Sequence, residues 1–94
     1  METLKRYLVE SYKVQKDRGK IKEDTKEQEF ISALTDEINE MQDEIYGTDK
    51  WLCECVDSVT VLLNMAMHEY GVDHIIKMLE YNLRNNKLRK EYGL

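Results

Sequence analysis

Residues 50–70 read KWLCECVDSVTVLLNMAMHEY, and this stretch decides the fold class. It contains no glycine or proline, and its apolar residues recur every three to four positions, which is typical of an amphipathic helix. These residues are Leu52, Cys55, Val56, Val59, Leu62, Leu63, Ala66, Met67 and Tyr70. So wide an apolar face suits the centre of a helical bundle. We expect Thr48 or Asp49 to cap this helix and Gly71 to end it.

A second central helix is predicted to precede it. Its apolar residues follow a clean helical period and are Phe30, Leu34, Ile38, Met41 and Ile45. Asp24 or Thr25 is the expected N-cap. The helix is expected to run to about Tyr46, with Gly47 as its left-handed C-cap.

Both ends of the chain predict further helices. Residues 2–17 form a first amphipathic helix, whose place in the bundle the sequence leaves open, and residues 18–23 connect it to the next. Residues 74–90 form a last helix after a cap at Asp73, with basic side chains in its final turns, where they suit the helix dipole. No segment alternates with period two. The prediction is therefore an all-α bundle of about four helices in a single domain, residues 1–94.

Size and composition support that fold class. The chain has 94 residues, four glycines and no proline, which argues against sandwiches, barrels and βαβ arrays. A domain this short buries only a modest core. We therefore expect a homo-oligomer.

Charge and hydropathy narrow the partners and the compartment. The net charge of −5 disfavours nucleic acid as a partner, but not a nucleotide bridged by a divalent metal ion. No apolar run approaches the ~18 residues of a membrane span, and residues 1–20 lack a signal-peptide core. We expect a cytoplasmic protein with no membrane partner. Cys53 and Cys55 fit neither a redox pair nor a zinc site, so free thiols are expected.

The acidic residues carry the functional signal. At about 100° per residue, Glu37, Glu40 and Glu44 form one stripe beside the apolar face of the second helix. Glu54 and Asp57 share a face of the third helix, opposite its apolar side. If the two helices pack antiparallel, the two i, i+3 carboxylate pairs face one another across the bundle.

Converging carboxylates repel one another unless a cation lies between them. Mg²⁺, or Mn²⁺, takes oxygen ligands and leaves coordination positions for water and phosphate oxygens. It also makes water a usable nucleophile near neutral pH. The opposing interpretation is a solvated acidic face, which arises readily in a chain with 19 Asp and Glu residues.

The arrangement Glu37-x-x-Glu40, thirteen residues, then Glu54-x-x-Asp57 resembles the signature of the MazG-like nucleoside triphosphate pyrophosphohydrolases, an all-α family. The family motif begins with Glu where this chain has Asp36. The order of elements is also similar: an acidic pair, a turn, Lys-Trp, a second acidic pair, a glycine turn, then a basic, Asn-rich helix. The resemblance covers about residues 28–93.

This resemblance implies a function and its residues. Such proteins use Mg²⁺ to hydrolyse a nucleoside triphosphate to the monophosphate and pyrophosphate. Carried over to this chain, the metal ligands would be Glu37, Glu40, Glu54 and Asp57. One of them, or the neighbouring Glu44, would orient the attacking water. The implied role is control of a nucleotide pool.

Several polar or aromatic residues are candidates for substrate binding. Each has a structural alternative: Lys50 as an exposed first-turn lysine, Trp51 as packing at a helix junction or subunit interface, and Asn64 as a buried amide bonded to a neighbouring helix. Asn86 and Arg89 match the tail of the family best, with Asn82 as the rival alignment. The small size and the resemblance together imply a homodimer or a homotetramer. Its active sites would take the tail helix from a second subunit, with Trp51 as a further candidate.

Two rival functions remain from the sequence. One is a non-enzymatic helical interaction module whose acidic stripe is solvated. The other is a di-iron carboxylate bundle, which needs Glu-x-x-His; neither His68 nor His74 follows a Glu at that spacing.

Overall fold

The computed structural model describes residues 2–93 and contains four α-helices. They are α1 (Glu2–Asp17), α2 (Glu27–Gln42), α3 (Asp49–Glu69) and α4 (Val72–Tyr92). No strand occurs within the described range. The predicted all-α class is therefore confirmed.

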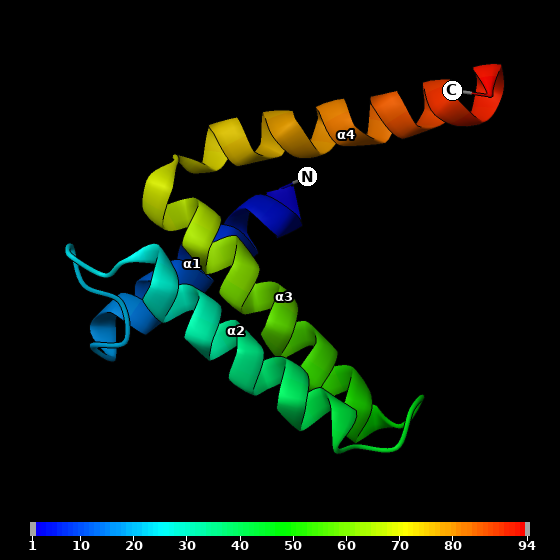
Figure 1. Ribbon diagram of the computed structural model, residues 1–94. Helices are drawn as coiled ribbons and strands as arrows, with labels where there is room; N and C mark the ends of the chain where they lie inside the picture. The colour runs from blue at the N-terminus through cyan, green and yellow to red at the C-terminus, as the bar shows by residue number, and fades with distance from the viewer. Residues whose placement is uncertain (1, 94) are drawn as a thin grey trace.

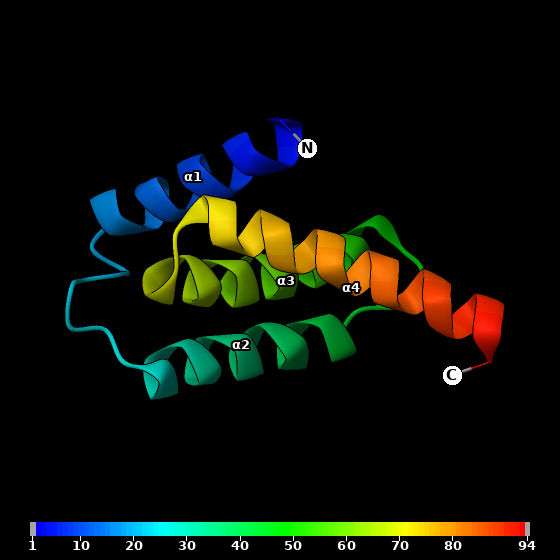
Figure 2. The same ribbon diagram turned by 90° about the horizontal axis from the view of Figure 1, so that it is seen from above.

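The helix α3 is the centre of the arrangement. It lies between α1 and α2, and α2 runs antiparallel to it along most of its length (Figures 1 and 2). The helix α4 turns away at the end of α3 and extends beyond the other three helices (Figure 2). The pair α2 and α3 therefore forms the scaffold for the acidic residues, and α1 closes its side.

The hydrophobic core is small. Its buried apolar residues are Leu8 of α1, Ile21 of the connection, Phe30 of α2 and Ile75 of α4. Each comes from a different segment, so these few side chains join the four parts of the chain. The modest core expected for a chain of this length is what the structure contains.

The orientation of α3 differs from a simple bundle. Its two buried residues are polar, Ser58 and Asn64, whereas its apolar side is largely open to solvent. The exposed apolar residues of that side are Leu52, Val56, Val59, Leu62 and Tyr70. The expectation that the wide apolar face fills the centre of the bundle is thus wrong for the single chain. The acidic and amide-bearing side of α3 faces α2 and α1 instead.

The start of α3 is as predicted, and that of α2 is not. Thr48 caps α3, and its Oγ1 accepts a hydrogen bond from the backbone N–H of Trp51 at 3.3 Å. The N-cap of α2 is Lys26 rather than Asp24 or Thr25. Thr25 is not available as a cap because its Oγ1 accepts from the N–H of Lys22, at 2.8 Å.

The cap of α2 comes instead from within the helix. The Oε2 of Glu29 accepts from the backbone N–H of Lys26 at 2.7 Å, which is one half of a capping box. A side chain from the first turn of α2 therefore stabilises the N-terminus of the same helix.

The end of α2 also departs from the prediction. The helix ends at Gln42, so Ile45, Tyr46 and Gly47 lie in the connection to α3. Gly47 has a left-handed φ of 85°, but it belongs to this turn and not to the helix cap. The turn is closed at Thr48, whose N–H and Oγ1 both donate to the carbonyl of Ile45. Residues that the apolar period had predicted to be the end of α2 therefore form the turn that leads into the antiparallel α3.

The last helix begins two residues earlier than predicted. Gly71 is the N-cap of α4, and Asp73 lies inside the first turn. The carboxylate of Asp73 pairs with Lys5 of α1 at 3.1 Å. The helix continues to Tyr92 and ends at Gly93, whose φ of 67° is left-handed.

Candidate functional site

Three carboxylates from two helices converge in the middle of the α2–α3 pair. Glu37 of α2 and Glu54 and Asp57 of α3 each have an oxygen within 4.8 Å of the others. The fourth acid, Glu40, lies one turn after Glu37, and it contributes to raising the pKa of both Glu37 and Glu54. The two carboxylate pairs expected to face one another thus meet, and we call these four residues the acid cluster.

The geometry follows from the antiparallel packing. Residues three apart lie on the same side of a helix, so each pair points in one direction. The connection 43–48 then brings α3 back along α2 (Figure 1). Glu44 lies in that connection, beyond the last turn of α2, and is not among the converging carboxylates. The helical stripe that placed Glu44 beside Glu37 and Glu40 does not extend that far.

Two oxygens of the cluster are buried without a partner. The Oε2 atoms of Glu37 and Glu54 are inaccessible to solvent, and neither has a hydrogen-bond partner among the described residues. Buried polar atoms in proteins nearly always have a partner, since an unpaired one costs free energy. Unpaired carboxylate oxygens in a cluster of acids are suited to receive a cation.

The pKa values of Glu37 and Glu54 also show that these carboxyl groups are unfavourable in their charged form. Burial, together with the charges of Glu40 and Asp57 and the contact with Glu54, raises the pKa of Glu37 from 4.5 to about 7. Burial raises the pKa of Glu54 as well, followed by its contact with Glu40. Both shifts express the cost of gathering negative charges where water does not fully solvate them.

No basic side chain of the described residues forms an ion pair with the acid cluster. The two ion pairs found join Lys5 to Asp73 and Lys16 to Glu23. Within residues 2–93, the negative charge of the acid cluster is therefore not neutralised by a side-chain ion pair.

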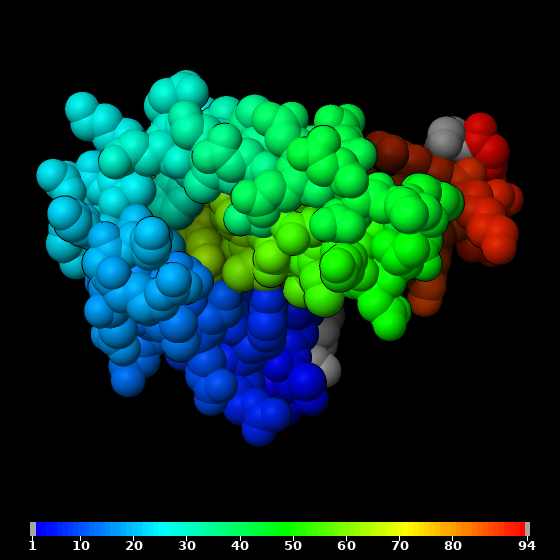
Figure 3. All heavy atoms as spheres, turned by 90° about the horizontal axis from the view of Figure 1, so that it is seen from below, coloured from blue at the N-terminus to red at the C-terminus, as the bar shows by residue number. Residues whose placement is uncertain are grey.

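A cavity of about 460 Å³ begins at the acid cluster. It lies between α1, α2, α3 and the connection 18–26, and Figure 3 shows atoms of α3 (yellow-green) at the bottom of a depression between α1 and α2. Its lining is formed by Gln15, Arg18, Lys20, Ile21, Thr25, Glu29, Phe30, Ala33, Glu37, Asp57, Thr60, Val61 and Asn64. The acids therefore lie at the end of a space large enough for a small organic molecule.

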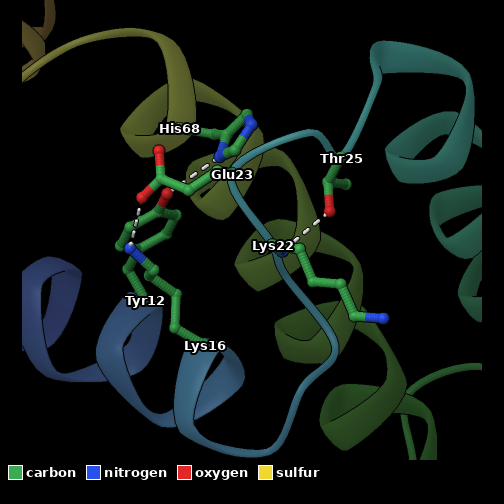
Figure 4. Close-up of polar contacts among 6 residues, drawn as sticks. All are labelled: Tyr12, Lys16, Lys22, Glu23, Thr25 and His68. Atoms are coloured by element: carbon green, nitrogen blue, oxygen red, sulfur yellow. Dashed lines mark hydrogen bonds and ion pairs between the residues drawn. The ribbon is translucent and has the colours of Figure 1, made fainter.

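The walls near α1 are fixed by a few polar contacts. The Tyr12 hydroxyl and the Nδ1 of His68 are 2.8 Å apart, which ties α1 to α3 (Figure 4). The ring of His68 also contacts Phe30, with ring centroids 5.3 Å apart. In the same region Lys16 pairs with Glu23 at 3.5 Å and holds the connection against α1 (Figure 4). His68 thus has a packing role, remote from the acid cluster.

The remaining predicted residues divide between those near the cavity and those away from it. Asn64 is buried, and its Oδ1 accepts from Ser11 Oγ of α1 at 3.4 Å, which is the alternative of a buried amide bonded to a neighbouring helix. It also lines the cavity, and a contact with substrate stays a prediction. Lys50 is exposed in the first turn of α3. Trp51 packs edge-on against Tyr46, with centroids 4.8 Å apart, and is not part of the cavity lining.

The tail residues lie apart from the cavity within this chain. Asn82, Asn86 and Arg89 are all exposed on α4, and the Nδ2 of Asn86 donates to the Oδ1 of Asn82 at 3.3 Å. The structure therefore does not bring them to the acid cluster of the same chain.

The cavity wall formed by the end of α1 and the connection after it was not among the predicted site residues. Gln15, Arg18 and Lys20 line the cavity, yet the segment 18–23 was interpreted only as a connection. The available signal was a pair of basic residues around Gly19, next to the start of the helix that carries the acids.

No family model, no curated protein and no solved structure matches this chain. Among the described residues, no helix is both long enough and apolar enough to cross a membrane.

Proposed function

We propose that this protein is a Mg²⁺- or Mn²⁺-dependent nucleoside triphosphate pyrophosphohydrolase, which releases the nucleoside monophosphate and pyrophosphate. The observation that carries the proposal is the convergence of Glu37, Glu54 and Asp57, with Glu40 beside them, at the end of a cavity of about 460 Å³. The type of reaction is inferred from the resemblance of their spacing to the MazG-like motif.

The acid cluster fits a hard divalent cation. It offers only oxygen ligands, which Mg²⁺ and Mn²⁺ prefer. Two of these oxygens are buried and unpaired. A divalent ion bound there would satisfy them, supply positive charge to the reacting phosphates and make water more acidic.

The residues of this chain would have separate tasks. Glu37 and Asp57 both line the cavity, so they would hold the ion where the substrate enters. Glu54 and Glu40 do not line the cavity and would complete the oxygen set. One carboxylate of this group, or the neighbouring Glu44, would orient the attacking water and accept its proton.

We also propose that the active form is a homodimer or a homotetramer. The apolar side of α3 is exposed, with Val56 and Val59 at 49% and 52%. The helix α4 carries further exposed apolar residues, among them Leu83 at 56%. A second copy covering these surfaces would also bring its tail helix, with Asn86 and Arg89, to another protomer.

The experiment is a panel of ribo- and deoxyribonucleoside triphosphates incubated with Mg²⁺, with products separated by chromatography. Glu54→Gln is the inactive variant, and Glu10→Gln on the exposed side of α1 is the matched control. Monophosphate and pyrophosphate, lost only in Glu54→Gln, are the expected result. Diphosphate and orthophosphate would contradict the assigned reaction, and no turnover of any nucleotide would contradict the function.

The second candidate function is a helical interaction module without enzymatic activity. The exposed apolar side of α3 favours it, because such a surface suits a protein partner. Metal binding separates the two candidates, since an interaction module has no need of a cation at the acid cluster.

A further inference from the structure

The cavity beside the acid cluster has a second end, formed by α1, the connection after it and the first turn of α2. We propose that this end binds the nucleoside portion of the substrate and that the amides of Asn64 and Gln15 contact the base. The inference rests on the proposed function, because that function places the reacting phosphate at the acid cluster.

The dimensions of the cavity suit a nucleoside. Its volume of about 460 Å³ lies within the range of small-molecule sites. Glu29 and Glu37 both line it and are eight residues apart on α2, which is about 12 Å along the helix. A diphosphate extending from the acid cluster would fill only part of that length, whereas a base and sugar would extend along it.

The walls of the far end are chemically unlike a phosphate site. Ile21 and Phe30 are buried apolar residues of the lining, and Val61 adds a third apolar side chain from α3. A flat, uncharged base is the part of a nucleotide that such walls accept.

Two amides supply the polar contacts that a base requires. Asn64 is only 5% exposed, and because its Oδ1 accepts from Ser11, its Nδ2 is the atom left to donate to a ligand. Gln15 lines the same cavity from α1 and offers both a donor and an acceptor. Arg18 and Lys20 are exposed, so they lie at the rim rather than at the depth of Asn64.

The test measures binding rather than turnover. Ala33 lines the cavity one turn before Glu37, so Ala33→Leu reduces the space without removing an acid. Ser32→Leu, at the exposed preceding position and outside the lining, is the matched control. Asn64→Asp exchanges the amide donor for an acceptor. Nucleoside monophosphates and inorganic pyrophosphate, each with Mg²⁺, are titrated into every variant by calorimetry.

We expect Ala33→Leu and Asn64→Asp to weaken monophosphate binding by about tenfold, as for the loss of one buried contact. Pyrophosphate binding should change by less than about twofold. Pyrophosphate has no nucleoside, so it would bind at the acid cluster and not reach the altered end of the cavity. Ser32→Leu should resemble the wild type in both titrations. Asn64→Asp should also change the order of preference among bases.

Three results would overturn the inference. They are an equal loss of pyrophosphate binding in Ala33→Leu, unchanged monophosphate binding in both variants, and no monophosphate binding by the wild type. The proposed function is judged separately, by hydrolysis of triphosphates by the wild type. Monophosphate binding that depends on Ala33, without any hydrolysis, would remove the function and leave the nucleoside site.

Discussion

Glu37 of α2 and Glu54 of α3 lie against each other, and each has a buried Oε2 without a hydrogen-bond partner among the described residues. Two carboxylates placed in this way destabilise the fold when both are charged. The helices nevertheless pack so that α3 turns its acids inward and its apolar side outward. An arrangement that costs stability in the free chain is expected where a ligand completes a site.

The first prediction is that divalent cations stabilise the protein. A ligand that binds only the native state adds about 1 kcal/mol at roughly five times its Kd, which raises the Tm of a domain of this size by about 4–8 °C. We expect Mg²⁺ or Mn²⁺ to give such a rise at matched ionic strength, measured by scanning calorimetry. Glu54→Gln should lose most of it, and Glu10→Gln should keep it. An equal rise in both variants would place the cation elsewhere.

The second prediction concerns the pH dependence of the metal-free protein. The pKa of Glu37 is raised from 4.5 to about 7, so between these values the native state binds a proton that the unfolded state has released. Stability contributed by this group therefore falls as pH rises from about 4.5 and is lost above about 7. The partial exposure of Glu37 reduces the effect by solvent screening.

Glu37→Gln removes this titration while keeping the size of the side chain. We expect the Tm of the wild type to fall between pH 5 and pH 8 on the order of a few degrees more than that of the variant. Thermal unfolding in a chelating buffer at several pH values measures the difference. Parallel curves for the two proteins would show that Glu37 titrates normally.

The third prediction tests the small core. Leu8 is the most deeply buried apolar side chain of the described residues, at 1% exposure, whereas its neighbour Val9 is 43% exposed. Leu8→Ala should lower the free energy of unfolding by about 2–5 kcal/mol, and Val9→Ala by about 0.5 kcal/mol or less. Urea unfolding followed by circular dichroism compares the two. Similar losses would mean that α1 is not held by its buried face.

The helices could be predicted from the sequence because their apolar residues recur with a helical period. The class, the four segments, the Thr48 cap and the meeting of the two acid pairs all follow from spacing along a helix. The ends of α2 depend on local hydrogen bonds, which the spacing of apolar residues along the sequence does not predict. Thr25 is engaged by Lys22, and the turn closed at Thr48 takes up Ile45.

The cavity could not be predicted, because it forms where segments distant in sequence meet. Gln15 of α1, Ala33 of α2 and Asn64 of α3 line one space only once the three helices are packed. The same limit applies to α3. An apolar face in a sequence shows that a helix has a surface to bury, but it does not show whether the same chain or a second copy covers it.

The fourth prediction is that a second copy covers α3. The wild type should sediment at equilibrium as a multiple of 11.2 kDa. Val59→Lys, on the exposed apolar side of α3, should shift it toward the monomer. Val14→Lys, at a similarly exposed position of α1, should not. A wild type that sediments as a monomer at all concentrations would contradict the prediction.

The fifth prediction separates the acids of the cluster from those outside it. Asp57 belongs to the converging carboxylates and lines the cavity, whereas Glu44 lies in the connection after α2. Asp57→Asn should reduce kcat for triphosphate hydrolysis by about 100-fold or more, the usual scale for losing one group that stabilises charge in a reacting phosphate. Glu44→Gln should change kcat by less than about threefold, because its carboxylate lies outside the acid cluster and its charge is screened by solvent. Steady-state rates with saturating Mg²⁺ decide between them.

If Glu44→Gln were as inactive as Asp57→Asn, the attacking water would be oriented from the turn, and the helix pair would have to close around the substrate to bring Glu44 within reach.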